Sequence, residues 1–91
     1  MGDYELHNEE IAVCIALLGA ELKSLKDIHS GREYMWSGDP AFWKRVSPVL
    51  FPLVGNYRNK QAVYEGKAYP LSQHGFARDR EFTLVSQTDE E

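Results

Sequence analysis

Large and small apolar residues alternate near the start of the chain. From Ile11 to Leu17 the bulky side chains occupy the odd positions and the small ones the even positions. A period of two predicts a β-strand with one heavy and one light face, buried on both sides. Tyr4 and Leu6 alternate in the same way before the polar HNEE segment, so a hairpin is expected here. Leucines at helical spacing leave a helix over residues 9–26 as the alternative, but the β-branched residues favour the strand.

Turn-forming residues divide the rest of the chain into short segments. Ser30-Gly31 predicts a turn, after which residues 34–36 are expected to resume an extended strand. Residues 62–64 and 68–71 flank a Glu-Gly pair, which is typical of a second hairpin. A last strand is expected to begin at Phe82. Short strands separated by Gly, Pro, Asn and Asp predict a mainly β fold, either a sandwich or a barrel.

The middle segment, SGDPAFWKRVSPVLFPLVGN, has a different pattern. Asp39-Pro40 predicts a short helical turn or a loop. Pro48 and Pro52 bracket an apolar triplet, and proline lacks the backbone N–H that a central strand needs. We therefore expect a buried, irregular connection that positions other residues.

Length and charge restrict the classes of protein. The chain has 91 residues, enough for one domain at most. Its 43% apolar and 26% charged residues are typical of a soluble globular protein, and its net charge of −4 argues against a nucleic-acid partner. The acidic start is unlike a signal peptide, and the longest apolar run, about ten residues, is too short to cross a membrane. A cytoplasmic protein without membrane contact is expected.

The sequence gives no sign of a metal or a cofactor. Cys14 is the only cysteine, which excludes an internal disulfide and a cysteine-based metal site. His7, His29 and His74 lack the spacing of metal ligands. There is no glycine-rich phosphate loop and no serine nucleophile elbow.

His74 is the leading candidate for a functional side chain. Imidazole can donate or accept a proton near neutral pH, and the adjacent Gly75 would let a ligand approach the backbone. Arg78 would share a face with His74 in an extended segment. Together they would suit a polyhydroxylated or anionic small molecule, whereas the simpler alternative is a loop histidine hydrogen-bonded to the backbone.

Further candidates flank the proline-rich segment. The guanidinium groups of Arg45 and Arg58 could grip hydroxyl pairs or carboxylates, or be solvated surface charges. Asn56, after Gly55, suits either a left-handed turn or a ligand-binding amide, and the turn is the commoner use. Large aromatic residues suit a sugar-stacking platform or, more commonly, a packed core. They are Trp36, Phe42 and Trp43.

Four motifs follow one another along the chain: GAELKSL, EYMWSGDPAFWKRVSPVLFPLVG, YEGKAYPL and QHGFARDREF. In this order and spacing, the chain from Leu6 to about Phe82 resembles the start of an aldose 1-epimerase (galactose mutarotase). More narrowly, it is similar to the galactose-mutarotase-related proteins of the lactose-operon type. PVLFP followed by QHGFARD carries most of the resemblance.

The resemblance implies a fold and a reaction. The fold is an antiparallel β-sandwich, the supersandwich, and the reaction interconverts the α and β anomers of a hexose without a cofactor. A carboxylate takes the anomeric proton and a histidine protonates the ring oxygen, so the ring opens and recloses. His74 corresponds to the family's first active-site histidine. The general-base glutamate and the usual ring-protonating histidine lie in later family segments, so residues 1–91 would form a partial sandwich domain.

The resemblance also implies roles for four binding residues. Asn56 stands where the family usually has an arginine, and Arg58 is a substitute for it if the segment is extended. Arg45 corresponds to an arginine of hexose-phosphate mutarotase relatives. Arg78 would orient its loop through Asp79 or reach the ligand. The expected ligand is a hexose or a hexose phosphate.

Three functions stay open for this chain. It could be part of a catalytic epimerase, a non-catalytic carbohydrate-binding protein of the same fold, or a structural fragment that completes a larger sandwich. A partial sandwich exposes strand edges and apolar faces. Either a homodimer or association with the missing remainder of the domain is therefore expected.

Overall fold

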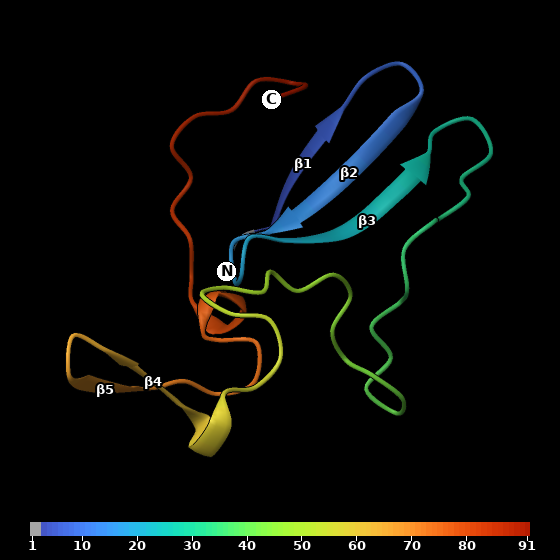
Figure 1. The fold of residues 1–91 in the computed structure, drawn as a ribbon. Helices are drawn as coiled ribbons and strands as arrows, with labels where there is room; N and C mark the ends of the chain where they lie inside the picture. Colours follow the sequence, from blue (N-terminus) through green and yellow to red (C-terminus); the bar gives the residue numbers. More distant parts are fainter. Residues whose placement is uncertain (1–2) are drawn as a thin grey trace.

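A computed structural model describes residues 3–91, and its regular elements are short strands and 3-10 turns (Figure 1). An antiparallel sheet has the order β1 (Asp3–His7), β2 (Ile11–Ala16), β3 (Glu21–Asp27). A separate hairpin pairs β4 (Gln61–Tyr64) with β5 (Lys67–Pro70). The 3-10 turns are η1 (Arg58–Lys60) and η2 (Ala77–Asp79). The mainly β, antiparallel prediction is therefore confirmed; residues 1 and 2 of the predicted domain lie outside the described part.

The N-terminal hairpin is confirmed, and residues 9–26 form no helix. Tyr4 lies opposite Ile15 and Leu6 opposite Val13, so the large apolar side chains share one face. The side chain of Asn8 closes the turn, because its Oδ1 accepts the backbone N–H of residues 10 and 11 at 2.7 and 2.9 Å. Local polar chemistry and the period of two thus agree on this element.

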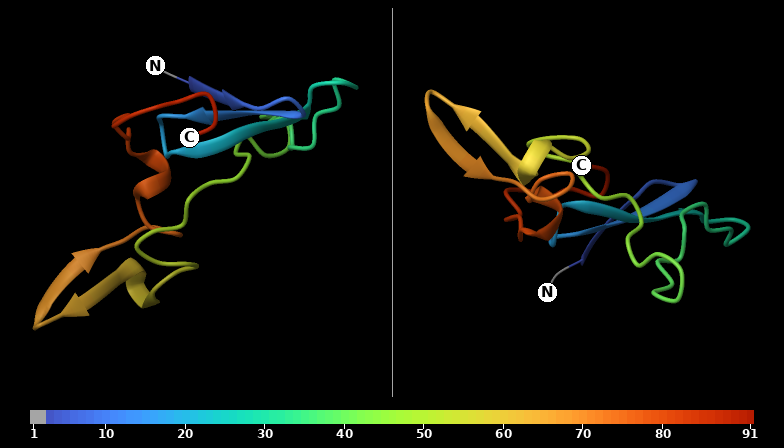
Figure 2. Two further views of the ribbon diagram at one scale, coloured as in Figure 1. Left: turned by 90° about the horizontal axis from the view of Figure 1, so that it is seen from above. Right: turned by 60° about the horizontal axis from the view of Figure 1, so that its bottom comes forward.

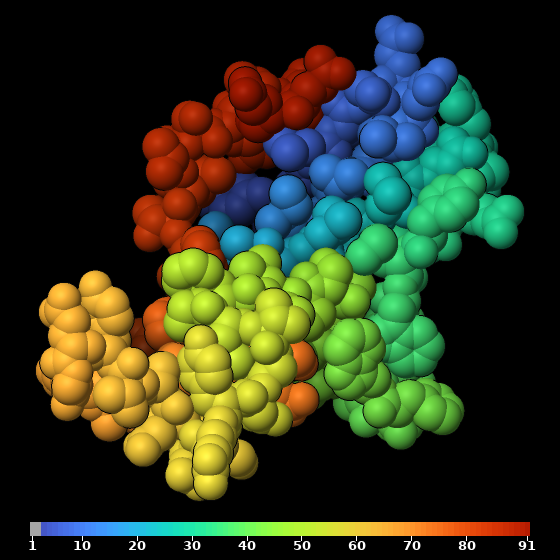
Figure 3. Space-filling view, viewed as in Figure 1, coloured from blue at the N-terminus to red at the C-terminus, as the bar shows by residue number. Residues whose placement is uncertain are grey.

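Neither face of the three-stranded sheet is packed into a core, so the expected burial of β2 on both sides is wrong for this chain. In β2 only Ala16 is buried. On the heavy face, the tail of residues 82–91 lies beside the sheet and leaves a hollow (Figure 3). The hollow measures about 300 Å³ and is lined by Tyr4, Leu6 and Leu84, among others. Within residues 3–91 no second β layer covers it.

The expected strand at residues 34–36 is wrong. Glu33 alone makes an isolated bridge, to Lys26 of β3. The Glu33 carboxylate also accepts the backbone N–H of Leu25 at 2.8 Å, a donor that a fourth strand would need. Trp36 instead turns its indole N–H to the carbonyl oxygen of Trp43, at 2.6 Å.

The proline-rich segment is attached to β3 through Glu21. This carboxylate is buried and accepts the backbone N–H of Val46 at 2.7 Å and of Ser47 at 3.0 Å. The Ser47 hydroxyl in turn donates to the carbonyl oxygen of Leu22 at 2.7 Å. The irregular course is confirmed, but the expected burial is not, because residues 49–51 are exposed.

Two further turns are confirmed. The carbonyl oxygen of Asp39 accepts the N–H groups of Phe42 and Trp43, both at 3.0 Å, which closes the turn expected at Asp39-Pro40. Glu65 and Gly66, both with positive φ, join β4 to β5. Each turn follows from residues that are neighbours in the sequence.

The strand expected to begin at Phe82 does not form. Glu81 makes an isolated bridge to Leu18, and Phe82 donates its N–H to the carbonyl oxygen of Leu17 at 2.8 Å. Farther on, the tail touches the outer edge of β1 through single hydrogen bonds rather than a ladder. A strand needs a continuous neighbour, and within residues 3–91 this tail has none.

The molecule is extended. Its radius of gyration is 16.4 Å, whereas a compact chain of this length has about 12 Å. Its accessible surface is 7097 Å², against about 5,400 Å² for a compact monomer of this mass. Figure 2 shows the β4–β5 hairpin projecting from the rest of the chain. Within residues 3–91 no helix is long and apolar enough to cross a membrane.

Candidate functional site

His74 lies in a tight loop between β5 and η2. Its backbone is left-handed, with φ of 62°, so the extended conformation expected around it is wrong. Its N–H donates to the carbonyl oxygen of Gly55 at 2.8 Å, and its ring Nδ1 accepts the Gly55 N–H at 2.8 Å. The simpler alternative, a loop histidine hydrogen-bonded to the backbone, therefore holds for the Nδ1 edge of the ring.

Gly75 holds this loop against the proline-rich segment. Gly75 is buried with φ of 77°, and a Cβ there would overlap the carbonyl oxygen of Phe51. The same oxygen accepts the N–H groups of Phe76 at 3.0 Å and Ala77 at 3.1 Å. The close approach that Gly75 permits is thus to the Phe51 backbone, and it fixes where His74 stands.

A hollow of about 450 Å³ opens beside His74. Its lining combines an indole, apolar side chains and polar groups from two loops, and it comprises Trp43, Val46, Ser47, Pro48, Leu50, Gln73, His74 and Arg78. Glu21 and Gly75 position the two loops from outside this lining. Such a mixture suits a small ligand with both apolar and hydroxyl surface.

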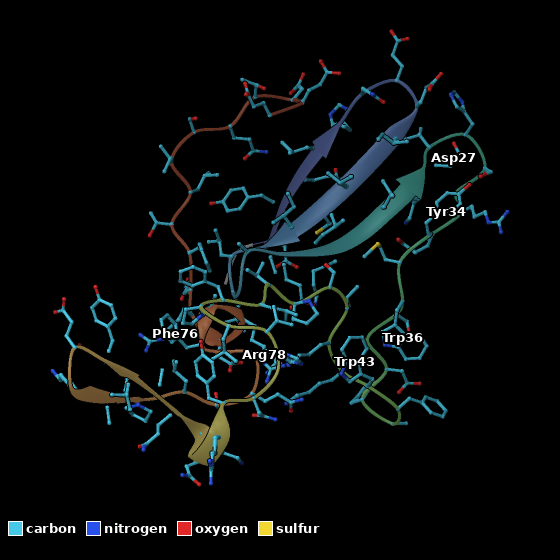
Figure 4. The ribbon with its side chains drawn as sticks, in the orientation of Figure 1. Asp27, Tyr34, Trp36, Trp43, Phe76 and Arg78 are labelled. Atoms are coloured by element: carbon cyan, nitrogen blue, oxygen red, sulfur yellow. The ribbon has the colours of Figure 1, made fainter. Side chains whose placement is uncertain are left out.

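Arg78 lines the same hollow as His74. In the view of Figure 4, Arg78 appears between Phe76 and Trp43. Because η2 is a 3-10 turn, the two residues do not share a strand face as expected. The Nη2 of Arg78 donates a hydrogen bond to the carbonyl oxygen of Gln73 at 3.0 Å. Its Nε is buried and finds no hydrogen-bond partner within the described residues. A buried N–H without a partner is uncommon and calls for an explanation.

Arg45 is engaged by Asp79. Its Nη2 lies 2.8 Å from Asp79 Oδ1, and its side chain is 23% exposed. This hydrogen bond lowers the pKa of the Asp79 carboxyl below its ordinary value. The carboxylate that Arg78 was expected to use is therefore bound by Arg45, which lies outside the lining of the hollow.

Asn56 and Arg58 are exposed and also lie outside the lining. The positive φ falls on Gly55, at 87°, so the left-handed turn proposed for Asn56 is wrong. Arg58 begins η1, so the extended geometry that would align it with Asn56 is absent. Of the four predicted binding residues, Arg78 alone shares the hollow with His74.

The large aromatic residues are exposed, which contradicts the packed-core alternative in this chain. Trp43 is 52% exposed and lines the hollow. Trp36 packs edge to face on Phe42 with ring centroids 6.4 Å apart. Ser47 and Gln73 were not predicted: both lie in the quoted motifs, but nothing in their residue type or spacing distinguished them as functional. Residues 3–91 contain no group of three or more His, Cys, Asp or Glu side chains that could hold a metal.

Known proteins resemble this chain over most of its length. A family model described as aldose 1-epimerase matches residues 2–91. Protein LacX of Lactococcus lactis subsp. lactis, in its plasmid and chromosomal forms, is 42% identical over 85 residues, which is 88% of this chain and 28% of each relative.

Two solved structures are similar to the chain over almost its full length. The galactose mutarotase related enzyme from Lactobacillus acidophilus is 44% identical with a TM-score of 0.92, over 97% of this chain and 29% of that one. A galactose mutarotase-like protein from Lactobacillus casei is 42% identical with a TM-score of 0.91, over 97% of this chain and 30% of that one. The chain thus spans less than a third of these relatives, with a partial galactose-mutarotase-like fold, and it belongs to the aldose 1-epimerase family.

Proposed function

We propose that this chain supplies the hexose-holding part of an aldose 1-epimerase-like site. The observation that carries the proposal is the placement of His74, fixed by Gly55, in one hollow with Arg78 and Trp43. An indole face stacks on the apolar face of a sugar ring, while N–H donors bind its oxygens. A chain of this family with such a hollow is suited to a hexose.

The same hollow lacks one group that the reaction needs. Interconversion of anomers requires a base for the anomeric hydroxyl and an acid for the ring oxygen. No Asp or Glu belongs to the described lining. The base is therefore expected from a second segment that completes the sandwich, and the chain is proposed to associate with that segment rather than to work alone.

Non-catalytic hexose binding is the second candidate, favoured by the same lack of a carboxylate. Both candidates predict binding, and they differ in whether a completed domain accelerates ring opening. Free and phosphorylated hexoses are distinguished by charge. Arg45 is already paired with Asp79, which leaves Arg78 as the guanidinium of the lining, so an unphosphorylated hexose is expected to bind at least as well.

The test uses polarimetry of freshly dissolved α-glucose and α-galactose. The chain is measured alone and after mixing with the part of the Lactobacillus acidophilus relative that this chain does not match. Faster mutarotation is expected only for the mixture. Binding without acceleration by a stable mixture would establish the non-catalytic candidate, and absence of both would reject the proposal. A mixture made with the His29→Ala variant is the control, because His29 lies in an exposed turn.

A further inference from the structure

The hollow beside His74 has two walls, which come from separate parts of the chain. The first wall lies within residues 43–50 and the second within residues 73–78, and neither contains a strand of either sheet. The walls meet where Gly75 packs against the carbonyl oxygen of Phe51. Both walls are also attached to the three-stranded sheet, at the corner where β2 leads into β3. This β2–β3 corner comprises residues 17–21.

The first wall is attached through Glu21, the first residue of β3. Its Oε2 accepts the N–H groups of Val46 at 2.7 Å and Ser47 at 3.0 Å, and both of these residues line the hollow. Hydrogen bonds to a charged acceptor are among the stronger ones, and Glu21 is only 5% exposed. Because both bonds end on one oxygen, the length of the Glu21 side chain sets the distance of this wall from β3.

The second wall is attached through Gly19, two residues earlier in the same corner. Its N–H donates to the carbonyl oxygen of Arg80 at 2.7 Å, directly after η2. Gly19 has φ of 75°, and a Cβ there would lie 2.7 Å from the carbonyl oxygen of Arg78, a residue of the lining. Only glycine allows this approach. Figure 1 shows η2 beside this end of the sheet.

We propose that the β2–β3 corner is the common base of the hollow, and that Glu21 and Gly19 are positioning residues that set the separation of its two walls without contacting the ligand. Neither residue belongs to the lining. A ligand that contacts both walls depends on their separation, since a displacement of about 1 Å is enough to weaken recognition. The hexose as ligand rests on the proposed function, whereas the placement of the walls does not.

Two variants of Glu21 separate side-chain length from charge. Glu21→Asp keeps the carboxylate but is one CH₂ shorter, whereas Glu21→Gln keeps the length and an acceptor oxygen but loses the charge. We expect Glu21→Asp to bind glucose and galactose roughly tenfold more weakly, and Glu21→Gln to lose less. Equal losses, or a larger loss for Glu21→Gln, would overturn the positioning role. Glu33→Asp is the control, because Glu33 also accepts backbone N–H groups but none from the lining.

Gly19 has a matched partner in Gly31. Both have φ of 75°, so an added side chain imposes the same backbone strain at each. A Cβ at Gly31 meets nothing within 4 Å, whereas one at Gly19 displaces the backbone of Arg78. We expect Gly19→Ala to bind the two hexoses roughly tenfold more weakly than Gly31→Ala. Equal affinities of the two variants would overturn the role of Gly19.

A measurement without sugar tests the walls directly. In ¹H–¹⁵N correlation spectra, we expect Glu21→Asp and Gly19→Ala each to shift the signals of both walls, represented by Ser47 and Gln73, and the two control variants to leave them in place. A Gln73 signal that does not move in Glu21→Asp would overturn the common base, even if a hexose binds. If neither hexose shifts the signals of the unmodified chain, the proposed function fails, and the spectra without sugar still decide the positioning role.

Discussion

Glu21 joins segments that are 25 residues apart, through two backbone N–H groups that converge on one carboxylate oxygen. The substitution Glu21→Ala is expected to lower the free energy of unfolding by roughly 1–3 kcal/mol, because it leaves the N–H groups of Val46 and Ser47 without an acceptor. Glu21→Gln keeps an acceptor oxygen and is expected to lose less. Urea denaturation of both variants measures the difference, and equal losses would contradict this role.

Glu33 gives the chain a specific sensitivity to acid. Its hydrogen bonds from the Ser24 hydroxyl, then from the N–H groups of Leu25 and Met35, lower its pKa from 4.5 to about 2. A lowered pKa in the folded state means that this contribution is complete above pH 4.5 and is lost as the pH falls towards 2. Below pH 4.5 the unmodified chain is therefore expected to approach the stability of Glu33→Gln. Denaturation at several pH values tests this, and a constant difference between the two proteins would contradict it.

The residue scale also shows what a sequence can and cannot predict. His74 was identifiable from its motif, and the structure places it beside a hollow. The pairing of Arg45 with Asp79 could not be predicted from the sequence. The two residues are 34 positions apart, and their contact depends on how the loops pack. The positions of Asn56 and Arg58 could not be predicted either. Both lie outside the lining of the hollow because the backbone turns at Gly55.

At the scale of elements, Gly75 and Gly66 provide a matched pair. Both have φ of 77°, so an added side chain imposes the same backbone strain at each. A Cβ at Gly75 meets the Phe51 carbonyl oxygen, whereas one at Gly66 meets nothing within 4 Å. Gly75→Ala is expected to cost about 1–3 kcal/mol more than Gly66→Ala. Thermal or urea unfolding measures the gap, and its absence would show that the two loops can separate freely.

Hairpins were predictable and single strands were not. The β1–β2 and β4–β5 hairpins are specified by alternation and by turn residues within about ten positions. Residues 34–36 and the segment from Phe82 have strand-like composition, but a strand forms only where a distant backbone offers a ladder of hydrogen bonds. Glu33 occupies one such edge, and within residues 3–91 the tail finds only isolated partners.

At the scale of the whole molecule, exposed apolar surface sets the expected behaviour. Large side chains such as Phe42, Val85 and Val54 are 80%, 95% and 75% exposed. We expect the isolated chain to self-associate and to bind an apolar dye, and both effects to decrease when the completing part of the domain is added. Size-exclusion chromatography with X-ray scattering tests this. A dye-free monomer with a radius of gyration near 16.4 Å would contradict it.

The projecting β4–β5 hairpin offers a site at which a reporter dye can be attached. At the base of the hairpin the Leu71 N–H donates a hydrogen bond of 2.9 Å to the Lys60 carbonyl oxygen. The paired strands therefore separate the tip from the His74 loop. Burial, followed by the nearby carboxylates of Asp3 and Glu5, raises the pKa of the Cys14 thiol, so less of it is thiolate at neutral pH. A cysteine introduced by Glu65→Cys is therefore the thiol that a maleimide dye would reach first. A reporter at that tip would follow assembly of the sandwich while leaving the lining of the hollow untouched.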